Sequence, residues 1–320
     1  MKPAPTLLAA AALGLAVAWP VGAAEPSVRA AEPVERPDSA LQSRLESLVQ
    51  GFHGSAGIYV RHLPSGRSAA VRSGETFPTA SMIKVPILLA VFDRLERGEL
   101  EYNQPVVYRS SDAYADDYIG GSLKDGATVY LNRAVWLMSS LSDNTSALQL
   151  TRLAGGAAAV NRWLEANGFP ATRDNSREPS RRAEYERWGW GQTTPREMAE
   201  LLVRIRQGRA VSAAAGEEMY RVLSRPFWDE TALSQIPPTV KAAAKVGAVD
   251  HSRSEAVLVN APSGDYVFCV ATKDQADTTY ADDNEGYRLI RAVSKALWET
   301  FEPGHPWTPA EGSRRYQKKD

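Results

Sequence analysis

The chain has 320 residues, of which 43% are hydrophobic and 23% are charged, with 37 basic and 38 acidic side chains. This composition is typical of an ordinary globular protein of one large or two small domains. A net charge of −1 offers no electrostatic basis for binding nucleic acid or an anionic membrane, so we expect no nucleic-acid partner.

The first 24 residues have the pattern of a secretory signal peptide. Lys2 precedes an apolar run over residues 7–18, and small residues follow up to Ala24. The run is too short to favour a membrane-spanning helix, and no cysteine follows it for lipid attachment. We therefore expect cleavage near Ala23 or Ala24, a periplasmic or secreted protein, and no membrane anchor. Residues 25–37, rich in Pro, Ala and Glu, predict a flexible linker.

Hydrophobic periodicity predicts the main elements. Apolar residues recur at helical spacing in several segments, which are 38–52, 129–141, 145–153, 157–167, 195–207 and 284–301. Short apolar runs bounded by turn residues predict strands over 57–61, 68–72, 256–260 and 266–271. Pro and Gly between paired runs indicate hairpins.

The order of these elements predicts an α/β (α+β) protein. Both chain ends contribute to one α/β subdomain, over residues 38–75 and 226–302, and an all-α subdomain over residues 76–225 is inserted between them. The polar residues 303–320 predict a loose C-terminal tail.

Ser81 and Lys84 lie three residues apart at the start of an apolar run. On a helix this spacing makes them neighbours on one face. Burial disfavours the charged form of a lysine, so a neutral Lys84 could take the proton of a Ser81 nucleophile. Pro86 indicates that the helix starts late, with Ser81 near its first turn. The structural alternative is a core helix that carries one Ser and one Lys by chance.

Three further stretches carry candidate chemistry. The Ser142-Asp143-Asn144 tripeptide offers a hydroxyl that can relay a proton and an amide that can hold a carbonyl, although Ser and Asp also favour helix caps. Lys245 precedes Gly247 at the start of a predicted strand, where a glycine allows close backbone approach. Glu178 lies in an irregular polar stretch, where a glutamate is usually a solvated loop charge.

Together, and in this order, the Ser81–Lys84, Ser142–Asn144 and Lys245–Gly247 motifs match the serine β-lactamases and penicillin-binding proteins. The sequence resembles class A β-lactamases over most of residues 38–302. An alignment on Thr194-Pro195 places Glu178-Pro179, without a gap, at the Glu-Pro of that family's omega loop. The resemblance implies an antiparallel sheet flanked by terminal helices with an inserted all-α domain, and no cofactor.

The resemblance also implies roles for the reacting groups. Ser81 would be the acylated nucleophile, Lys84 its proton partner, and Ser142 would pass a proton to the leaving nitrogen. Glu178 would activate the water that releases the product. The backbone N–H groups of Ser81 and Ala248 would form the oxyanion hole.

A second set of residues would bind the substrate by the same resemblance. Asn144 would position the substrate amide, and Lys245 with Gly247 would receive a substrate carboxylate. Arg253 stands one residue out of step with the family's strand arginine that assists in carboxylate binding.

Three departures from the family pattern affect these expectations. Val246 replaces the usual Thr or Ser of the third motif, which weakens the case for ordinary penicillins. Arg182 stands where the family has an asparagine that also holds the water. Ser176 and Gly191 occupy the positions of the Arg–Asp pair that usually closes the omega loop.

The first hypothesis is therefore an exported serine hydrolase that acts on a small-molecule β-lactam or related amide or ester through an acyl-enzyme, as a monomer. One alternative is a D,D-peptidase or esterase, and another is a penicillin-binding sensor that stays acylated. A GxSxG hydrolase is disfavoured because that motif is absent. We expect no metal, since the four histidines show no ligand spacing, and Cys269, the single cysteine, is expected to be a buried packing residue.

Overall fold

The computed structural model describes residues 33–114, 117, 120–316 and 318. These residues belong to one compact unit, Glu32–Asp320. The predicted signal peptide and most of the predicted linker lie outside the described residues. The linker prediction is wrong at its end, because Arg36–Pro37 form a short strand, β1, that pairs with the sheet.

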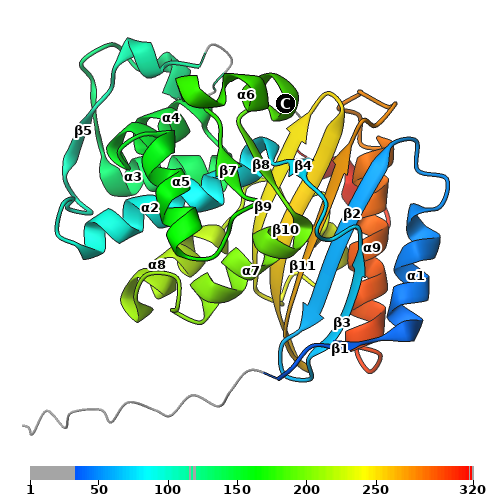
Figure 1. Cartoon of the computed structure of the whole chain (residues 1–320). Helices are drawn as coiled ribbons and strands as arrows, with labels where there is room; N and C mark the ends of the chain where they lie inside the picture. Colours follow the sequence, from blue (N-terminus) through cyan, green and yellow to red (C-terminus); the bar gives the residue numbers. More distant parts are fainter. Residues whose placement is uncertain (1–32, 115–116, 118–119, 317, 319–320) are drawn as a thin grey trace, which may run out of the picture. The chain divides into compact units, whose positions relative to one another are not determined.

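A six-stranded sheet is the centre of this unit, in the order β1-β3-β2-β11-β10-β9 (Figure 1). All its neighbouring strands are antiparallel except the β1–β3 pair. Glycines with positive φ angles turn the two predicted hairpins, Gly66 at 70° and Gly264 at 121°, a conformation that suits glycine. The remaining strands are β2 (Ser55–His62), β3 (Arg67–Val71), β9 (Ala242–Val249), β10 (Ser252–Ala261) and β11 (Gly264–Lys273).

The two terminal helices, α1 (Ser39–Val49) and α9 (Glu285–Phe301), cover one face of the sheet (Figure 1). Side chains alternate between faces along a strand. Val257 and Val259 accordingly pack with α1 and α9, whereas Leu258 packs in the core on the other side. The predicted antiparallel sheet flanked by terminal helices is confirmed.

The other face of the sheet packs against the helical segment. Its central helix is α2 (Lys84–Glu96), which is buried without interruption over residues 84–92, and α7 (Pro195–Arg206) contacts β2, β10 and β11 directly. The other helices are α3 (Leu131–Trp136), α4 (Asn144–Leu153), α5 (Ala157–Ala166), α6 (Arg182–Trp188) and α8 (Ala213–Leu223).

The segment predicted to be all-α also contains two small antiparallel sheets. One pairs β5 (Pro105–Val107) with β6 (Thr128–Tyr130). The other joins β4 (Phe77–Pro78), β8 (Gly191–Thr193) and β7 (Arg173–Asp174). This three-stranded sheet is important for the site, because it connects the chain just before Ser81 to the strands on either side of the Glu178 loop.

The described part of the C-terminal tail, predicted to be loose, is largely exposed, but polar contacts join it to the rest of the unit. The indole N–H of Trp298 donates to the His305 carbonyl at 2.8 Å, and Arg314 pairs with Asp282 at 3.5 Å. A cleft of 1430 Å³ opens between this tail and residues 224–242. None of the predicted site residues lines it.

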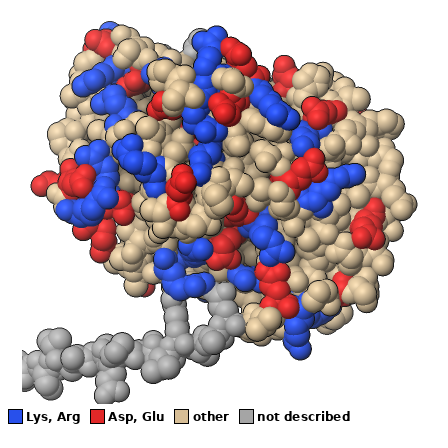
Figure 2. All heavy atoms as spheres, in the orientation of Figure 1, with Lys and Arg blue, Asp and Glu red and all other residues tan. Residues whose placement is uncertain are grey.

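The surface in Figure 2 carries basic and acidic side chains interspersed, as a net charge near zero would suggest. Within the described ranges, no helix combines the length and the apolar character needed to cross a membrane.

Candidate active site

Ser81 lies in a single 3₁₀ turn, η1 (Ala80–Ile83), which leads directly into α2. The predicted late helix start is confirmed, since α2 begins at Lys84 and Pro86 is its third residue. A proline is tolerated there because the first N–H groups of a helix have no partner within it. Ala80 has a φ of 42°, an uncommon conformation for a residue with a Cβ that often accompanies functional sites.

Lys84 forms hydrogen bonds to the other predicted site residues. It is 1% exposed, and its Nζ lies 3.1 Å from the Ser81 Oγ, 3.1 Å from the Ser142 Oγ and 2.6 Å from the Asn144 Oδ1. Burial lowers the pKa of Lys84 to about 7, although the charges of Asp117 and Asp143 act in the opposite direction. A large fraction of neutral amine near neutral pH allows Lys84 to accept the Ser81 proton.

The Ser142–Asn144 tripeptide forms a helix cap and also contacts Lys84. Asp143 caps α4, where its carboxylate accepts from the Ser146 N–H at 2.6 Å and from the Gly120 N–H at 2.9 Å. Ser142 follows a π-helical turn and has a φ of 64°. Capping by the middle residue leaves Ser142 and Asn144 to contact Lys84, so the cap and the site do not compete.

Lys245 on β9 completes the cluster. It is 2% exposed, and its Nζ donates to the Ser142 Oγ at 2.9 Å and to the Val246 carbonyl at 3.1 Å. The Ser142 hydroxyl therefore lies between two buried lysines. Burial, and then the charge of Lys84, hold the pKa of Lys245 well below its usual range, while Glu255 acts against this shift.

Gly247 brings β9 against the turn that carries Ser81. A Cβ at this position would lie 2.5 Å from the Thr79 carbonyl oxygen and 3.2 Å from the Ala80 Cβ. Only a glycine allows this approach. It places Ala248 and Ser81, the two proposed oxyanion donors, on segments in direct contact.

Glu178 is not joined to this cluster by a hydrogen bond or ion pair among the described residues. Its carboxylate instead accepts from the Ser180 hydroxyl at 2.7 Å and from the Ser180 N–H at 3.3 Å, as the cap of a 3₁₀ turn. The Ser180 hydroxyl, then its N–H and the charge of Arg181, lower the pKa of Glu178. The side chain is thus held as a weaker base than an ordinary glutamate.

The loop around Glu178 is closed without the family's Arg–Asp pair. Ser176 donates its N–H to the Asp174 carboxylate at 2.8 Å, and Asp174 pairs with Gly191 across β7 and β8. A Cβ at Gly191 would lie 2.7 Å from the Thr79 Oγ1, so this glycine lets the loop base pack on η1. The Arg182 side chain is 79% exposed, and its guanidinium pairs with Glu186 at 2.7 Å rather than with Glu178.

The assignment of Arg253 to a substrate carboxylate is wrong in this structure. Arg253 is fully buried, its guanidinium donates to backbone carbonyls that include Ser252 at 2.9 Å, and it lies over the Tyr280 ring at 4.3 Å. In the register Arg253 pairs with Ala248, whereas Ser254 pairs with Gly247. Val246 pairs with Glu255, so its side chain leaves β9 on the face opposite to that of Lys245.

Two supporting residues were missed from the sequence. Asp117 accepts the Asn144 N–H at 2.9 Å and acts on the pKa of Lys84. Trp228 donates its indole N–H to the Leu141 carbonyl at 3.0 Å, directly before Ser142. An isolated Asp or Trp in an irregular segment has no periodicity or spacing that would reveal such a contact. Across the described part of the chain, no group of three His, Cys, Asp or Glu side chains could hold a metal ion.

Comparison with known proteins matches residues 40–301 to the Beta-lactamase enzyme family. The chain is 20% identical over 276 residues to beta-lactamase VEB-1 of Pseudomonas aeruginosa, covering 82% of this chain and 90% of that protein. It is 28% identical over 264 residues to a beta-lactamase of Streptomyces fradiae, covering 80% and 84%.

The solved structure of PBP-A is similar with a TM-score of 0.76 and 26% identity, over 85% of this chain and 100% of that one. A mutant of PBP-A, solved as an acyl-enzyme complex with penicillin-G, matches with the same TM-score and 27% identity, over 85% and 99% of the two chains. The fold, the Ser81–Lys84 cluster and these similarities agree, and the chain belongs to the beta-lactamase enzyme family, as a class A β-lactamase-like serine hydrolase.

Proposed function

We propose that this protein is an exported hydrolase that opens β-lactam rings through an acyl-enzyme on Ser81. The observation that carries the proposal is the hydrogen-bonded group of Ser81, Lys84, Ser142 and Lys245, in which a buried amine with a pKa of about 7 lies 3.1 Å from the Ser81 hydroxyl. Nucleophilic catalysis by serine requires a base at this distance.

In the acylation step, the Ser81 Oγ attacks the lactam carbonyl carbon and its proton passes to the Lys84 Nζ. The C–N bond then breaks, and the leaving nitrogen receives a proton through the Ser142 hydroxyl, which lies within 3.1 Å of both lysines. The N–H groups of Ser81 and Ala248 would stabilise the oxyanion, where the loss of one donor typically slows a reaction by about 10²–10³-fold. Asn144 would hold the amide of the substrate, and Lys245 would supply positive charge.

In the deacylation step, we propose that Glu178 activates the water that attacks the Ser81 ester. Its bond to Ser180 must first break, and its lowered pKa makes it a weak base. We therefore infer that deacylation is slower than acylation.

A second candidate function, a penicillin-binding protein that stays acylated, is favoured by the position of Glu178. In that case the attack of water on the ester would have no general base.

We further propose that the segment over residues 1–24 directs export to the periplasm or the medium. It has the charged, apolar and small-residue regions of a signal peptide. Cell fractionation, with the mature N-terminus sequenced, tests this; an intact N-terminus in the cytoplasm would contradict it.

The test of the activity is an intact-mass time course with a penicillin, beside hydrolysis of nitrocefin and of a D-Ala-D-Ala peptide. The proposal predicts an adduct on Ser81 that forms and then decays, with turnover of nitrocefin. A persistent adduct would support the penicillin-binding alternative, peptide cleavage would support a D,D-peptidase, and no adduct would contradict the acyl-enzyme.

A further inference from the structure

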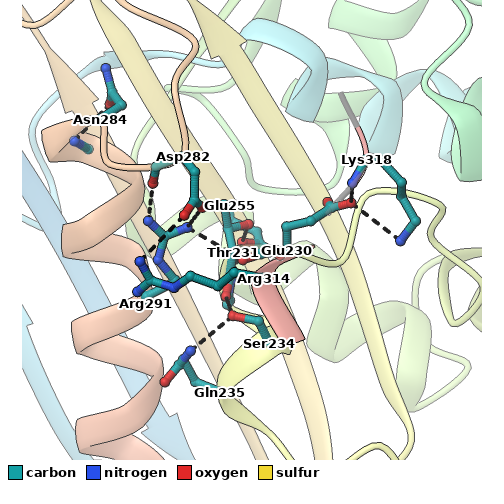
Figure 3. A network of polar contacts seen from close by, with 12 residues as sticks. Glu230, Thr231, Ser234, Gln235, Glu255, Asp282, Asn284, Arg291, Arg314 and Lys318 are labelled. Atoms are coloured by element: carbon teal, nitrogen blue, oxygen red, sulfur yellow. Dashed lines mark hydrogen bonds and ion pairs between the residues drawn. The ribbon is translucent and has the colours of Figure 1, made fainter. Parts of the chain in front are cut away.

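A buried carboxylate lies behind the site on the strand next to β9. Glu255 on β10 is 0% exposed, and one of its oxygens accepts from the Ala232 N–H at 2.9 Å and from the Thr231 hydroxyl (Figure 3). Its Oε1 has no hydrogen-bond partner among the residues that the structure describes. A buried carboxylate with a free oxygen carries a large desolvation cost, which a function could explain.

Glu255 is close to Lys245 in the sheet. The register pairs Lys245 with Ala256 and Val246 with Glu255, so Lys245 and Glu255 are one step apart on neighbouring strands. Their side chains leave opposite faces at the edge of the sheet, but a charge–charge interaction does not need direct contact, and the dry interior transmits it well.

The site needs such a charge because it holds two buried lysines. Lys84 and Lys245 both donate to the Ser142 Oγ. Two ammonium groups that share one hydroxyl repel each other. The proposed mechanism requires different protonation states of the two lysines: Lys84 must be neutral to act as a base, and Lys245 must be charged. A nearby carboxylate can set which lysine keeps its proton, and environments that push two titrating groups apart assign their roles.

We propose that Glu255 is a positioning residue for Lys245, whose buried carboxylate keeps the Lys245 ammonium charged while Lys84 is neutral. The inference rests on the proposed function, in which Lys84 is the base. Burial and the charge of Lys84 lower the pKa of Lys245, and among the described residues Glu255 is the carboxylate that opposes this shift, whereas Asp117 and Asp143 act on Lys84. Burial raises the pKa of Glu255 itself to about 7, against the effects of Thr231, Ala232 and Lys245.

The other charged groups around Glu255 are already engaged. Glu230 bonds to the Lys318 N–H at 3.0 Å, Arg291 on α9 pairs with Asp282 at 3.0 Å, and the guanidinium of Arg253 is bound to backbone carbonyls (Figure 3 shows the first two). On β11, burial and then the charge of Glu255 raise the pKa of the Cys269 thiol, which therefore stays neutral.

The direct test is an NMR pH titration of the full chain with ¹³C at the lysine Cε atoms, in which Lys245→Arg identifies the Lys245 signal. In Glu255→Gln, the midpoint of Lys245 should fall by about one pH unit or more, the size expected for a unit charge several ångströms away at an effective dielectric constant of about 20. The pH above which the acylation rate falls should decrease together with the Lys245 midpoint.

A matched control separates charge from loop anchoring. Ser294 on α9 donates to the Ala232 carbonyl at 2.7 Å, so Ser294→Ala loosens the same loop while it keeps the carboxylate, and it should leave the Lys245 midpoint unchanged. Equal midpoints in wild type and a folded Glu255→Gln would overturn the proposal.

If Glu255→Gln does not fold, Thr231→Val decides, because losing a hydrogen bond raises the pKa of Glu255 and weakens its charge. Thr231→Val should lower the Lys245 midpoint relative to Ser294→Ala, and equal midpoints would overturn the proposal. Failure of wild type to form a penicillin adduct would contradict the proposed function but would leave this NMR comparison valid.

Discussion

The Ser81 cluster and the loop over residues 174–191 carry the two halves of the proposed reaction, and they are built differently. In the cluster, Lys84 and Lys245 are buried and share the Ser142 hydroxyl within 3.1 Å. In the loop, Glu178 bonds to its own neighbour Ser180. The groups for acylation are therefore assembled before a substrate arrives, whereas the group for deacylation has to be released first.

The largest effect should come from the nucleophile. Ser81→Ala should abolish both the adduct and hydrolysis, because no other serine in the chain has a lysine three residues later. Intact-mass spectrometry and nitrocefin turnover measure this. Turnover near that of wild type in Ser81→Ala would contradict the nucleophile assignment.

The two lysines should respond differently to substitution by arginine. A guanidinium stays protonated, so Lys84→Arg should slow acylation by about 10²–10⁴-fold, the usual range for a lost general base. Lys245→Arg keeps its charge and should cost less. Equal losses in the two variants, measured by stopped-flow acylation, would contradict the division of roles.

The wild-type pH profile tests the same division. Acylation needs neutral Lys84, so kcat/KM should rise with pH up to about 7, following a pKa of about 7, and should fall again only where Lys245 loses its proton. Below that value the rate should fall about tenfold per pH unit. A profile that is flat between pH 5 and 8 would exclude Lys84 as the base.

Two substitutions in the Glu178 loop should have smaller effects on the decay of the adduct, in opposite directions. Glu178→Gln should slow the decay of the adduct by about 10–100-fold, near or below the low end of the range for general bases, because Ser180 already restrains the carboxylate. Ser180→Ala should free Glu178, raise its pKa and speed the decay several-fold. Equal decay rates in wild type and Glu178→Gln would remove Glu178 from the mechanism.

The last effect concerns the stability of the loop base and not the reaction rates. Burial raises the pKa of Asp174 from 3.8 to about 6. The folded state therefore holds this proton more tightly, and its contribution to stability, present at low pH, is lost as pH rises from about 4 to about 6.

Asp174→Asn should remove this part of the pH dependence, which amounts to about 3 kcal/mol for a shift of about two units. Urea unfolding of both proteins at pH 4 and pH 7 measures it. The substituted amide could lower the free energy of unfolding equally at both pH values. The informative quantity is therefore the change in this free energy between pH 4 and pH 7, compared between the two proteins. An unchanged difference would contradict the shifted pKa.

Much of the fold could be predicted because its strands and helices have strong local signals. Gly66 and Gly264 adopt positive φ angles in the turns that their neighbours predicted. Helix α6 was missed because none of its residues is buried, which leaves no apolar stripe to detect. The tail is held by contacts such as Arg314 with Asp282, and sequence patterns do not encode partners so far apart.

The site shows the same limit more sharply. Ser81, Lys84, Ser142, Asn144 and Lys245 could be found because motif spacing fixes their order, and the structure brings them together. Arg253 was misplaced because it is one residue away from Ser254, and a shift of one residue in a strand moves a side chain to the other face. The orientation of Glu178 depends on a local bond to Ser180 that alignment cannot reveal.

The measurement that tests the central claim most directly is a single-turnover mass-spectrometric time course with one reporter penicillin, which gives the acylation and deacylation rates of wild type together. The account predicts that acylation is the faster step, so that the Ser81 adduct accumulates before it decays. Hydrolysis without accumulation of an adduct, or an adduct that forms equally well in Ser81→Ala, would contradict it.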